Sequence, residues 1–414
     1  MVEMLLALLI TRTIINNLFT FLIIRDLSIK RNYDRQLKPD RHLIFVLPVF
    51  QEIQLIETAI AYVARLINGF HNVDVYIVGN SREKNQYGQN PTLEIAKNMT
   101  RNRTDFHILE LDTTSGVMAH QINYAVSQIV QSGAKTTETW VHILNIDSRL
   151  SEDGLNAIVT CINRGDRIIQ QSAVFLSNFR SLGLIQKGVA LYQSRWTISH
   201  EIKRLWLHGI SSYLLAHVVG HGLCINLAKL LEYGNLPEDT LTEDLHFGYY
   251  VAASAEKITS LSILELADSP SRVSEIARQK YVWSFGPMLY PKYLLNYIRK
   301  FPAKWKLNYP RATLIMIQGV MSYINWLISS WLIAYFAYQS LESPATLIFL
   351  TLYLLEYVQC AVFFYRNGYI SLSDVLISPF IILASLLIHS LPADQAFVDM
   401  MLGHRIVKHK TAHV

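Results

Sequence analysis

Three long apolar stretches in the last quarter of the chain constrain its fold more than any other feature of the sequence. They cover residues 312–338, 344–365 and 372–391 of 414. A helix of about 20 apolar residues can cross a hydrocarbon core of about 30 Å, so we predict transmembrane helices over 312–391. Glu356 lies near the centre of the second stretch. Because an acid inside a membrane is costly, we expect Glu356 to hydrogen-bond to a neighbouring helix or to line a polar pathway.

The first 24 residues form a fourth, weaker apolar stretch. It contains Arg12 and Asn16, and it lacks a small-residue cleavage site, which argues against a removed signal peptide. We predict either a transmembrane helix or an interfacial helix over residues 1–24, followed by a basic linker over 25–42.

The composition excludes two other classes of protein. Hydrophobic residues make up 51% of the chain and charged residues 17%, and the net charge is +5. A disordered chain needs low hydrophobicity and high charge, so that class is excluded. The three cysteines are too few for a disulfide scaffold. They are scattered without metal-site spacing, which fits a reducing compartment without disulfides.

Basic residues beside the apolar stretches predict the orientation of the chain. Lys and Arg are concentrated in residues 25–41 and 292–311. Because loops rich in Lys and Arg remain in the cytoplasm, the region between these flanks is expected there. We predict an integral membrane protein, in a bacterial inner membrane or its equivalent. Aromatic residues mixed with the basic ones over 291–311 indicate an amphipathic helix at the headgroup level rather than a nucleic-acid site.

The C-terminal tail, residues 392–414, conflicts with three simple crossings. Such a topology would leave the tail outside, yet the tail contains Arg405, Lys408 and Lys410. A re-entrant third segment or a further crossing near residues 396–402 would each remove the conflict, and the sequence leaves both open.

The middle of the chain, residues 43–290, alternates between strand and helix patterns. Short apolar runs predict strands over 42–49, 73–78, 106–111 and 140–146. Helical spacing of apolar residues predicts helices over 53–67, 92–99 and 120–132. Strands that alternate with helices form a mostly parallel sheet covered by helices, so the predicted fold class is α/β. In such sheets ligands bind at the carboxyl ends of the strands.

Polar residues follow the predicted strands at that edge. Pro48–Glu52 follows the first strand, Asn80 follows the second, and Asn145-Ile146-Asp147 follows the fourth. Thr242-Glu243-Asp244 and Gln279–Trp283 come later in the chain. An Asp at a strand end is often only a helix cap or a turn residue. The order of these segments on one α/β domain beside apolar helices makes them candidates for a site.

In this order the motifs resemble those of the family 2 glycosyltransferases, in the membrane-embedded branch of the cellulose, chitin and hyaluronan synthases. The resemblance runs from about residue 43 to residue 283. Pro48–Glu52 is similar to the P-x-x-N-E nucleotide loop, with Gln51 in the Asn place. Asn145–Asp147 is similar to the D-x-D metal motif, and Thr242–Asp244 matches T-E-D outright.

The other motifs depart from the family pattern. Gly116–Asn123 resembles the G-K-x-x-A-L-N helix, but Val117 stands where Lys is usual. Gln279–Trp283 resembles Q-x-x-R-W, but Val282 occupies the Arg place. Gly220-His221-Gly222 lies where the family has its acceptor-facing segment, and Lys410–His413 resembles a tail found in many members. Candidates for the missing cation are Arg82, Arg149 and Arg278.

The resemblance implies a GT-A-type nucleotide-sugar-binding domain over residues 43–290, fused to the transmembrane helices. It assigns donor binding to Pro48, Phe50, Glu52, Asn80, Asn123, Asn145 and Asp147. It assigns binding of the acceptor and of the diphosphate to His221, Gly222, Gln279 and Trp283. Asp147 would hold Mg²⁺ or Mn²⁺, since these ions prefer oxygen ligands, while Asn145 adds no charge. Asp244 would be the general base, and Glu243 would orient its loop.

The implied function is an inverting, metal-dependent transfer of a sugar from a nucleotide diphosphate-sugar, with UDP as the expected nucleotide. The acceptor hydroxyl would belong to a glycan or a lipid-linked molecule at the membrane. One version builds an envelope or capsular polysaccharide, and the other adds a single sugar to a lipid-linked acceptor. Val282 and the few crossings favour single transfer, whereas the C-terminal helices are compatible with both. A catalytically silent membrane scaffold is a third reading, and the sequence leaves the sugar and the oligomeric state open.

Overall fold

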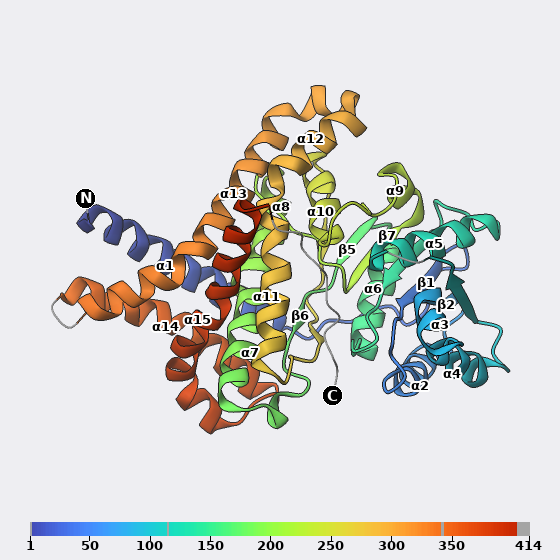
Figure 1. The fold of residues 1–414 in the computed structure, drawn as a ribbon, viewed down its shortest axis with the longest axis horizontal. Coiled ribbons are helices and arrows are strands. Elements are labelled where there is room, and N and C mark those ends of the chain that lie inside the picture. The colour runs from blue at the N-terminus through green and yellow to red at the C-terminus, as the bar shows by residue number, and fades with distance from the viewer. Residues whose placement is uncertain (1, 114–115, 341–342, 404–414) are drawn as a thin grey trace. The chain divides into compact units, whose positions relative to one another are not determined.

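The computed structural model describes residues 2–113, 116–340 and 343–403, and Figure 1 gives the order of the elements. The chain divides into two compact units. The sheet unit consists of Arg31–Ser172 and His217–Glu265. The helical unit consists of Met1–Lys30, Ala173–Ala216 and Leu266–Val414. Each unit is described by itself below.

The sheet unit contains a seven-stranded sheet in the order β3-β2-β1-β4-β7-β5-β8. The strands are β1 (His42–Pro48), β2 (Val73–Asn80), β3 (Phe106–Leu111), β4 (Thr139–Ile143), β5 (Ile168–Gln170), β7 (Leu223–Asn226) and β8 (Thr259–Ser260). The first four strands along this order pair in parallel, as predicted, and β7 is antiparallel to both β4 and β5. The carboxyl ends of β1, β2 and β4 therefore lie at one edge of the sheet.

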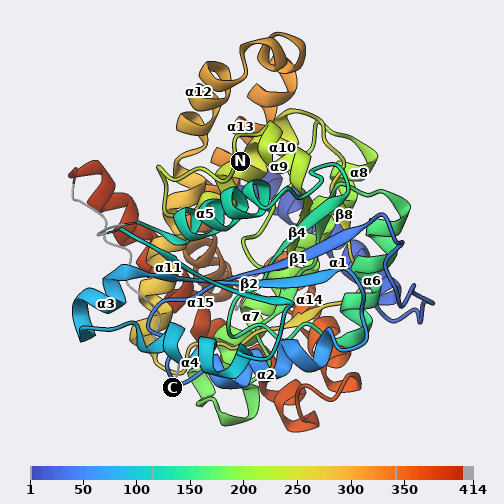
Figure 2. The same cartoon turned by 90° about the vertical axis from the view of Figure 1, so that its right-hand side faces the viewer.

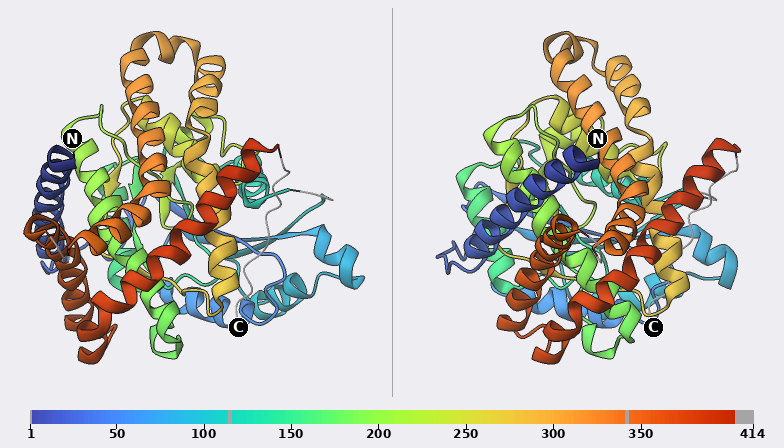
Figure 3. Two further views of the ribbon diagram at one scale, coloured as in Figure 1. Left: turned by 60° about the vertical axis from the view of Figure 1, so that its left-hand side comes forward. Right: turned by 90° about the vertical axis from the view of Figure 1, so that its left-hand side faces the viewer.

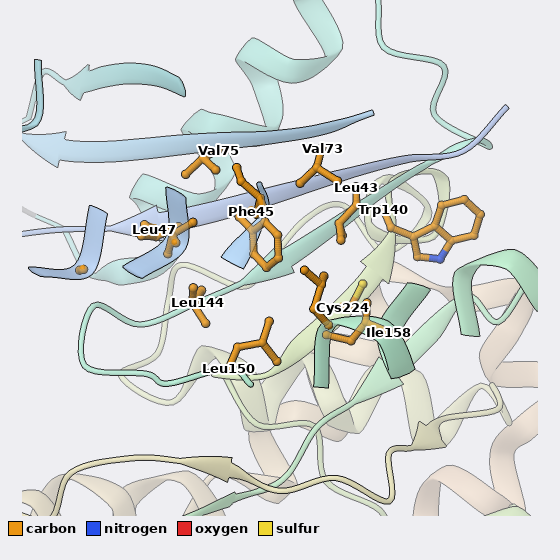
Figure 4. Close-up of a cluster of buried hydrophobic side chains, with 14 of the residues drawn as sticks. Leu43, Phe45, Leu47, Val73, Val75, Trp140, Leu144, Leu150, Ile158 and Cys224 are labelled. Carbon is orange, nitrogen blue, oxygen red and sulfur yellow. The ribbon is translucent and has the colours of Figure 1, made fainter. Parts of the chain in front are cut away.

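Helices cover both faces of this sheet, because the strands are apolar on both sides. They are α2 (Ile56–Leu66), α3 (Ser81–Tyr87), α4 (Pro91–Thr100), α5 (Met118–Gln131), α6 (Glu152–Arg164), α9 (Leu227–Glu232) and α10 (Glu243–Ala253). Alternate side chains of β1, such as Phe45, pack with α2, α4 and α6 in one buried cluster (Figure 4). Figure 2 shows α5 on the opposite side of β1 and β2.

The helical unit contains the long apolar helices. Its elements are α1 (Val2–Leu27), β6 (Ala173–Val174), η1 (Phe179–Ser181), α7 (Leu184–Trp196), η2 (Thr197–Ile202), α8 (Lys203–Ile210), α11 (Val273–Met288), α12 (Tyr290–Lys300), α13 (Pro302–Gln339), α14 (Pro344–Arg366) and α15 (Leu372–Met401). Strand β9 (Glu265–Leu266) lies where the chain enters this unit for the last time. Helix α1 packs against α14, and α15 packs against α7 and α11 (Figure 3).

Among the described residues, four helices are long and apolar enough to cross a membrane: α1, α13, α14 and α15. Helix α13 begins at Pro302, so the predicted interfacial segment is divided between α12 and the first turns of α13. Helix α15 is one helix of 30 residues, about 45 Å long, and no separate helix begins near residue 396. The basic tail residues from Arg405 onward, including Lys410–His413, lie outside the described residues.

Glu356 has a partner on another helix, as one of the two sequence alternatives expected. Its Oε1 accepts a hydrogen bond from Nη1 of Arg195 on α7 at 2.6 Å. Both side chains are almost fully buried, and the Arg195 guanidinium also lies over the ring of Tyr357 at 4.4 Å. Removing either partner would leave a buried charge uncompensated, which is strongly destabilising.

Candidate functional site

Glu83 shapes the loop that follows β1. This carboxylate is 1% exposed, and it accepts hydrogen bonds from the backbone of Gln51 at 2.7 Å and from the hydroxyl of Thr92 at 2.6 Å. The backbone of Gln51 adopts φ +56°, a conformation that residues other than glycine rarely adopt. The buried bonds to Glu83 therefore hold the Pro48–Glu52 loop in one shape, and sequence analysis missed this role.

The polar residues that follow β2 are partly engaged with one another. Asn80 is 1% exposed, and its Oδ1 accepts from the backbone N–H of Arg82 at 2.9 Å, which caps α3. The Arg82 guanidinium lies over the half-buried ring of Phe50, 4.6 Å from its centroid. Of the three arginines considered as substitutes for the missing lysine, Arg82 is the one beside the predicted nucleotide loop.

The turn after β4 presents Asp147. Asn145 and Asp147 are half-buried, and Ser148 N–H donates to Asn145 O at 3.1 Å to close the turn. Arg149 braces the same turn, since its Nη1 donates to Ile146 O and Ser148 O at 3.2 and 2.9 Å. No hydrogen bond or ion pair within the described part of the chain engages the Asp147 carboxylate. It is therefore available to a ligand.

The two acids of the T-E-D match begin helix α10 and differ in exposure. Asp244 is half-buried, whereas Glu243 is 3% exposed. The two carboxylate oxygens of Asp244 accept backbone N–H bonds from Gly220 at 2.9 Å and Leu245 at 2.7 Å. These bonds and the helix N-terminus fix the orientation of a negatively charged group. A substrate hydroxyl can reach Asp244 more easily than Glu243.

The segment Val219–Gly222 links the turn after β4 to Asp244. Gly222 N–H donates to Ile143 O at the end of β4, at 3.2 Å, while Gly220 N–H holds Asp244. Gly222 adopts φ +70°, and a Cβ there would lie 2.4 Å from Gln171 O. Only glycine fits this position. The segment is thus bonded both to the end of β4 and to the start of α10.

A buried acid lies beneath this segment. Glu265 is 0% exposed, and its Oε2 lies 3.8 Å from Nδ1 of His221. Burial raises the pKa of Glu265, but His221, Ser148 and the nearby His142 outweigh burial and hold the pKa below its usual value. Burial also lowers the pKa of His142 to about 4. Glu265 thus interacts electrostatically with two residues beside the site, His221 next to Gly220 and Ser148 next to Asp147.

Asn123 holds a loop in place. Its Nδ2 donates to Leu236 O at 2.9 Å and to Glu238 Oε1 at 2.8 Å, and its Oδ1 accepts from Leu236 N–H at 3.1 Å. Both ends of the amide are therefore engaged with the loop that leads into the T-E-D match. The structure makes Asn123 a positioning residue for this loop, and its contact with a donor stays a prediction.

The turn after β4 can bind a metal ion only if a bound ligand supplies further coordinating atoms. No group of three or more His, Cys, Asp or Glu residues that could bind a metal occurs within the described part of the chain. Asp147 offers one free carboxylate and Asn145 an amide oxygen beside it, and oxygen donors suit Mg²⁺ and Mn²⁺. Phosphate oxygens and water would have to complete the coordination, which is how Mg²⁺ is commonly bound at phosphate-binding sites.

Gln279 and Trp283 belong to the helical unit. They lie four residues apart on α11, as predicted, and both are half-buried. Lys280 lies with its Nζ 3.9 Å from the centroid of the Trp283 ring and donates to Gln193 Oε1 at 2.7 Å. Burial holds the pKa of Lys280 well below its usual value. The basic side chain beside Trp283 is therefore Lys280, whereas position 282 is a valine, and burial favours the uncharged form of this lysine.

Comparison with solved structures shows a likeness to a glycosyltransferase. The structure is similar to mannosyltransferase PcManGT from Pyrobaculum calidifontis, in complex with GDP-Man and Mn²⁺, with a TM-score of 0.51. Sequence identity is 15%, over 98% of this chain and 100% of that chain. S. aureus TarS 1–349 has a TM-score of 0.43 at 13% identity, over 88% of this chain and 92% of that chain. No protein-family model and no curated protein matches the sequence.

At this low identity the likeness to the mannosyltransferase shows the fold. The predicted fold class is confirmed: a GT-A-type, mostly parallel α/β sheet unit is joined to helices long enough to cross a membrane. Because the match covers 98% of the chain, it includes the long helices as well as the sheet.

Proposed function

We propose that this chain is a membrane-bound, inverting glycosyltransferase of family 2 that uses a nucleotide diphosphate-sugar, with UDP as the expected nucleotide. One observation carries the proposal: a half-buried Asp244 at the start of α10 is held by the same Gly220–Gly222 segment that pairs with the end of β4. The free Asp147 carboxylate follows β4 directly. The glycosyltransferase fold supports this assignment of the two acids.

In the proposed mechanism Asp244 takes the proton of the acceptor hydroxyl as the oxygen attacks the anomeric carbon. The bond between the anomeric carbon and the diphosphate breaks as the new glycosidic bond forms. Attack from the side opposite to the leaving group inverts the configuration, so an α-linked donor gives a β-linked product. The Gly220 and Leu245 N–H groups keep the Asp244 carboxylate in place during this step.

Asp147 would hold Mg²⁺ or Mn²⁺, with Asn145 beside it and phosphate oxygens completing the coordination. Such a cation offsets the negative charge that develops on the departing diphosphate. Arg82 adds a second positive charge beside the nucleotide loop, over Phe50. Pro48, Glu52 and Asn80 contact the nucleoside in this proposal, and the fixed loop shape set by Glu83 keeps that pocket in one conformation.

The product is proposed to be an envelope or capsular polysaccharide, with transfer of a single sugar to a lipid-linked acceptor as the alternative. Trp283 would stack on the acceptor sugar, and Gln279 would hydrogen-bond to the diphosphate. His221 and Gly222 would lie near the acceptor. Product length on a gel separates the two versions, since one added sugar excludes chain extension.

The test of the function is a screen of nucleotide sugars, including UDP- and GDP-sugars, for diphosphate release by the purified full chain, with and without membrane lipids. We expect release with at least one donor, and we expect excess chelator to stop it. Release that continues unchanged in excess chelator contradicts the metal role of Asp147. No release with any donor favours the catalytically silent scaffold.

A further inference from the structure

Two backbone N–H groups hold the Asp244 carboxylate, and they come from different kinds of structure. Leu245 follows Asp244 directly in helix α10, so the helix fixes its N–H. Gly220, whose N–H donates to Asp244 Oδ2 at 2.9 Å, lies in the stretch Leu215–Gly222, which belongs to no helix or strand. Glycine has the widest choice of backbone conformations. A group outside this stretch must therefore fix the direction of the Gly220 N–H.

The side chain of Gln170 meets the segment on both sides of Gly220. Gln170 ends β5, is 0% exposed and lies opposite Leu223 of β7, directly after the segment. Its Oε1 accepts a hydrogen bond from Val219 N–H at 2.9 Å. Its Nε2 donates to His221 O at 3.1 Å. One buried side chain thus holds the residue before Gly220 and the residue after it.

The amide of Gln170 can satisfy these partners in one orientation only. Its Nε2 donates a further bond to Gln171 O at 2.9 Å. An amide oxygen only accepts and an NH₂ group only donates, so Val219 N–H needs the oxygen, while the two carbonyls need the nitrogen. A reversed amide would place donor against donor and leave buried polar groups unpaired, which is costly. The bonds of Gln170 therefore select one conformation of the segment.

We propose that Gln170 is a positioning residue for sugar transfer, which holds both neighbours of Gly220 and so keeps the Gly220 N–H directed at the Asp244 carboxylate. The catalytic part of this inference rests on the proposed function. The part that concerns the segment itself can be tested without turnover, because the contacts of Gln170 belong to the folded chain.

The test variant is Gln170→Met, and its matched control is Gln171→Met. Methionine is close to glutamine in length but has no N–H group and is only a weak acceptor. Gln171 is also 0% exposed, and its Nε2 donates to Ile263 O at 3.3 Å. Within the described residues no hydrogen bond joins the Gln171 side chain to Val219–Gly222. The control therefore removes a buried amide of the same kind that does not hold the segment.

The first measurement is hydrogen exchange at single backbone amides of the full chain in detergent, read by mass spectrometry with electron-transfer fragmentation. The Val219 and Gly220 amides should exchange slowly in the unmodified chain, since each has a buried acceptor outside any helix or strand. We expect Gln170→Met to speed their exchange by about tenfold or more, and Gln171→Met to leave it unchanged. Fast exchange in the unmodified chain, or slow exchange in Gln170→Met, would overturn the proposal.

The second measurement is diphosphate release with a donor found in the screen of nucleotide sugars. Gln170→Met should lower kcat by up to about 10²-fold, because a misplaced catalytic group is costly. The KM for the donor should stay the same, since Gln170 is not among the proposed donor contacts. Gln171→Met should react like the unmodified chain. Equal losses in the two variants would show a general effect on the fold and contradict a positioning role.

A double-mutant cycle tests whether Gln170 acts through Asp244. In the Asp244→Asn background the base is already lost, so adding Gln170→Met should lower the residual rate little further. If the two losses multiply instead, Gln170 affects the rate by a route other than Asp244, and the proposal is wrong.

Failure of the proposed function remains distinguishable from failure of this inference. No diphosphate release by the unmodified chain with any donor would exclude the function and the catalytic role, while hydrogen exchange would still decide whether Gln170 holds the segment. If Gln170→Met does not fold, Gln170→Asn keeps the amide but withdraws it from the segment by one methylene. We expect the same faster exchange and lower kcat, and normal values in folded Gln170→Asn would refute the role of Gln170.

Discussion

Two adjacent acids at the start of α10 have different surroundings, and the difference separates their expected roles. Asp244 is half-buried and is held by two backbone N–H groups, whereas Glu243 is 3% exposed. A general base must come within hydrogen-bond distance of the proton that it accepts. The exposed fraction therefore favours Asp244 as the base and leaves Glu243 to support the loop.

We predict that Asp244→Asn lowers the rate of sugar transfer by about 10²- to 10⁴-fold, the usual contribution of a general base. Nucleotide binding should persist, because the amide keeps the shape of the carboxylate and one acceptor oxygen. The measurements are diphosphate release and nucleotide affinity by calorimetry. Asp239→Asn, on an exposed side chain of the same loop, is the control for loss of charge. A near-normal rate in Asp244→Asn would mean that another group is the base.

A second prediction concerns Lys203, whose pKa is lowered to about 8 by burial and by the neighbouring arginines, while Glu356 opposes the shift. Because the pKa of Lys203 is lower in the folded chain, the unfolded chain binds more protons between about pH 8 and the ordinary lysine pKa. The contribution of Lys203 to the free energy of unfolding therefore rises with pH across that window. Unfolding temperatures of the unmodified chain and of Lys203→Gln, measured in detergent across the window, test this, and the same pH dependence in both proteins would contradict it.

Sequence alone identified some residues of the candidate site and missed others for a physical reason. Asp147 follows the end of a strand, and Asp244 lies at the start of a helix. Local sequence patterns predict both positions. Glu83, Glu265 and Lys280 act through partners distant in sequence or on another face of an element, such as Gln51 for Glu83. When a single charged residue lies in a polar segment, the local sequence does not indicate that its side chain will be buried.

At the level of elements, Gly222 is the glycine of the sheet unit whose added Cβ would lie nearest to another atom. Its φ of +70° and the 2.4 Å that would separate an added Cβ from Gln171 O exclude any other side chain without movement of the backbone. Gly133 has a similar φ of +88°, but nothing lies within 4 Å of its Cβ position. Comparing substitutions at Gly222 and Gly133 therefore separates the free-energy cost of the backbone conformation from the cost of a steric clash.

We predict that Gly133→Ala costs about 1 kcal/mol through its backbone conformation alone. Gly222→Ala should lower the unfolding temperature in detergent by clearly more, since its methyl group meets a backbone carbonyl. It should also reduce sugar transfer, because Gly222 holds the segment that positions Asp244. Equal effects of the two substitutions on stability and on transfer would contradict this account.

The elements that sequence predicted best are those with local signals. The first four strands and helices α2, α4 and α5 lie within a few residues of their predicted ranges. The antiparallel strand β7 was missed, because its four residues become a strand only through pairing with β4 and β5. Helix α15 continues through Pro392 to Met401, where the sequence suggested an end, since α7 and α11 pack along it.

At the scale of the whole molecule, the four long apolar helices found among the described residues and two basic flanks make membrane orientation the central question. Arg25–Arg41 and Lys292–Arg311 are rich in positive charge, while the turn near Ser340 has none. The positive-inside rule predicts that the sheet unit lies in the cytoplasm and that the chain between α13 and α14 lies outside. The three native cysteines are buried, so they provide little background for thiol labelling.

We predict that Ser340→Cys reacts with a membrane-impermeant thiol reagent in intact spheroplasts, because this position should face the outside. Glu57→Cys, on an exposed side chain of α2, should react only after the membrane is opened with detergent. The unmodified chain is the control for reaction at the native cysteines. The reverse pattern would place the sheet unit outside, away from cytoplasmic nucleotide sugars. The donor would then have to be supplied on the other side of the membrane, and the proposed reaction could not proceed as described.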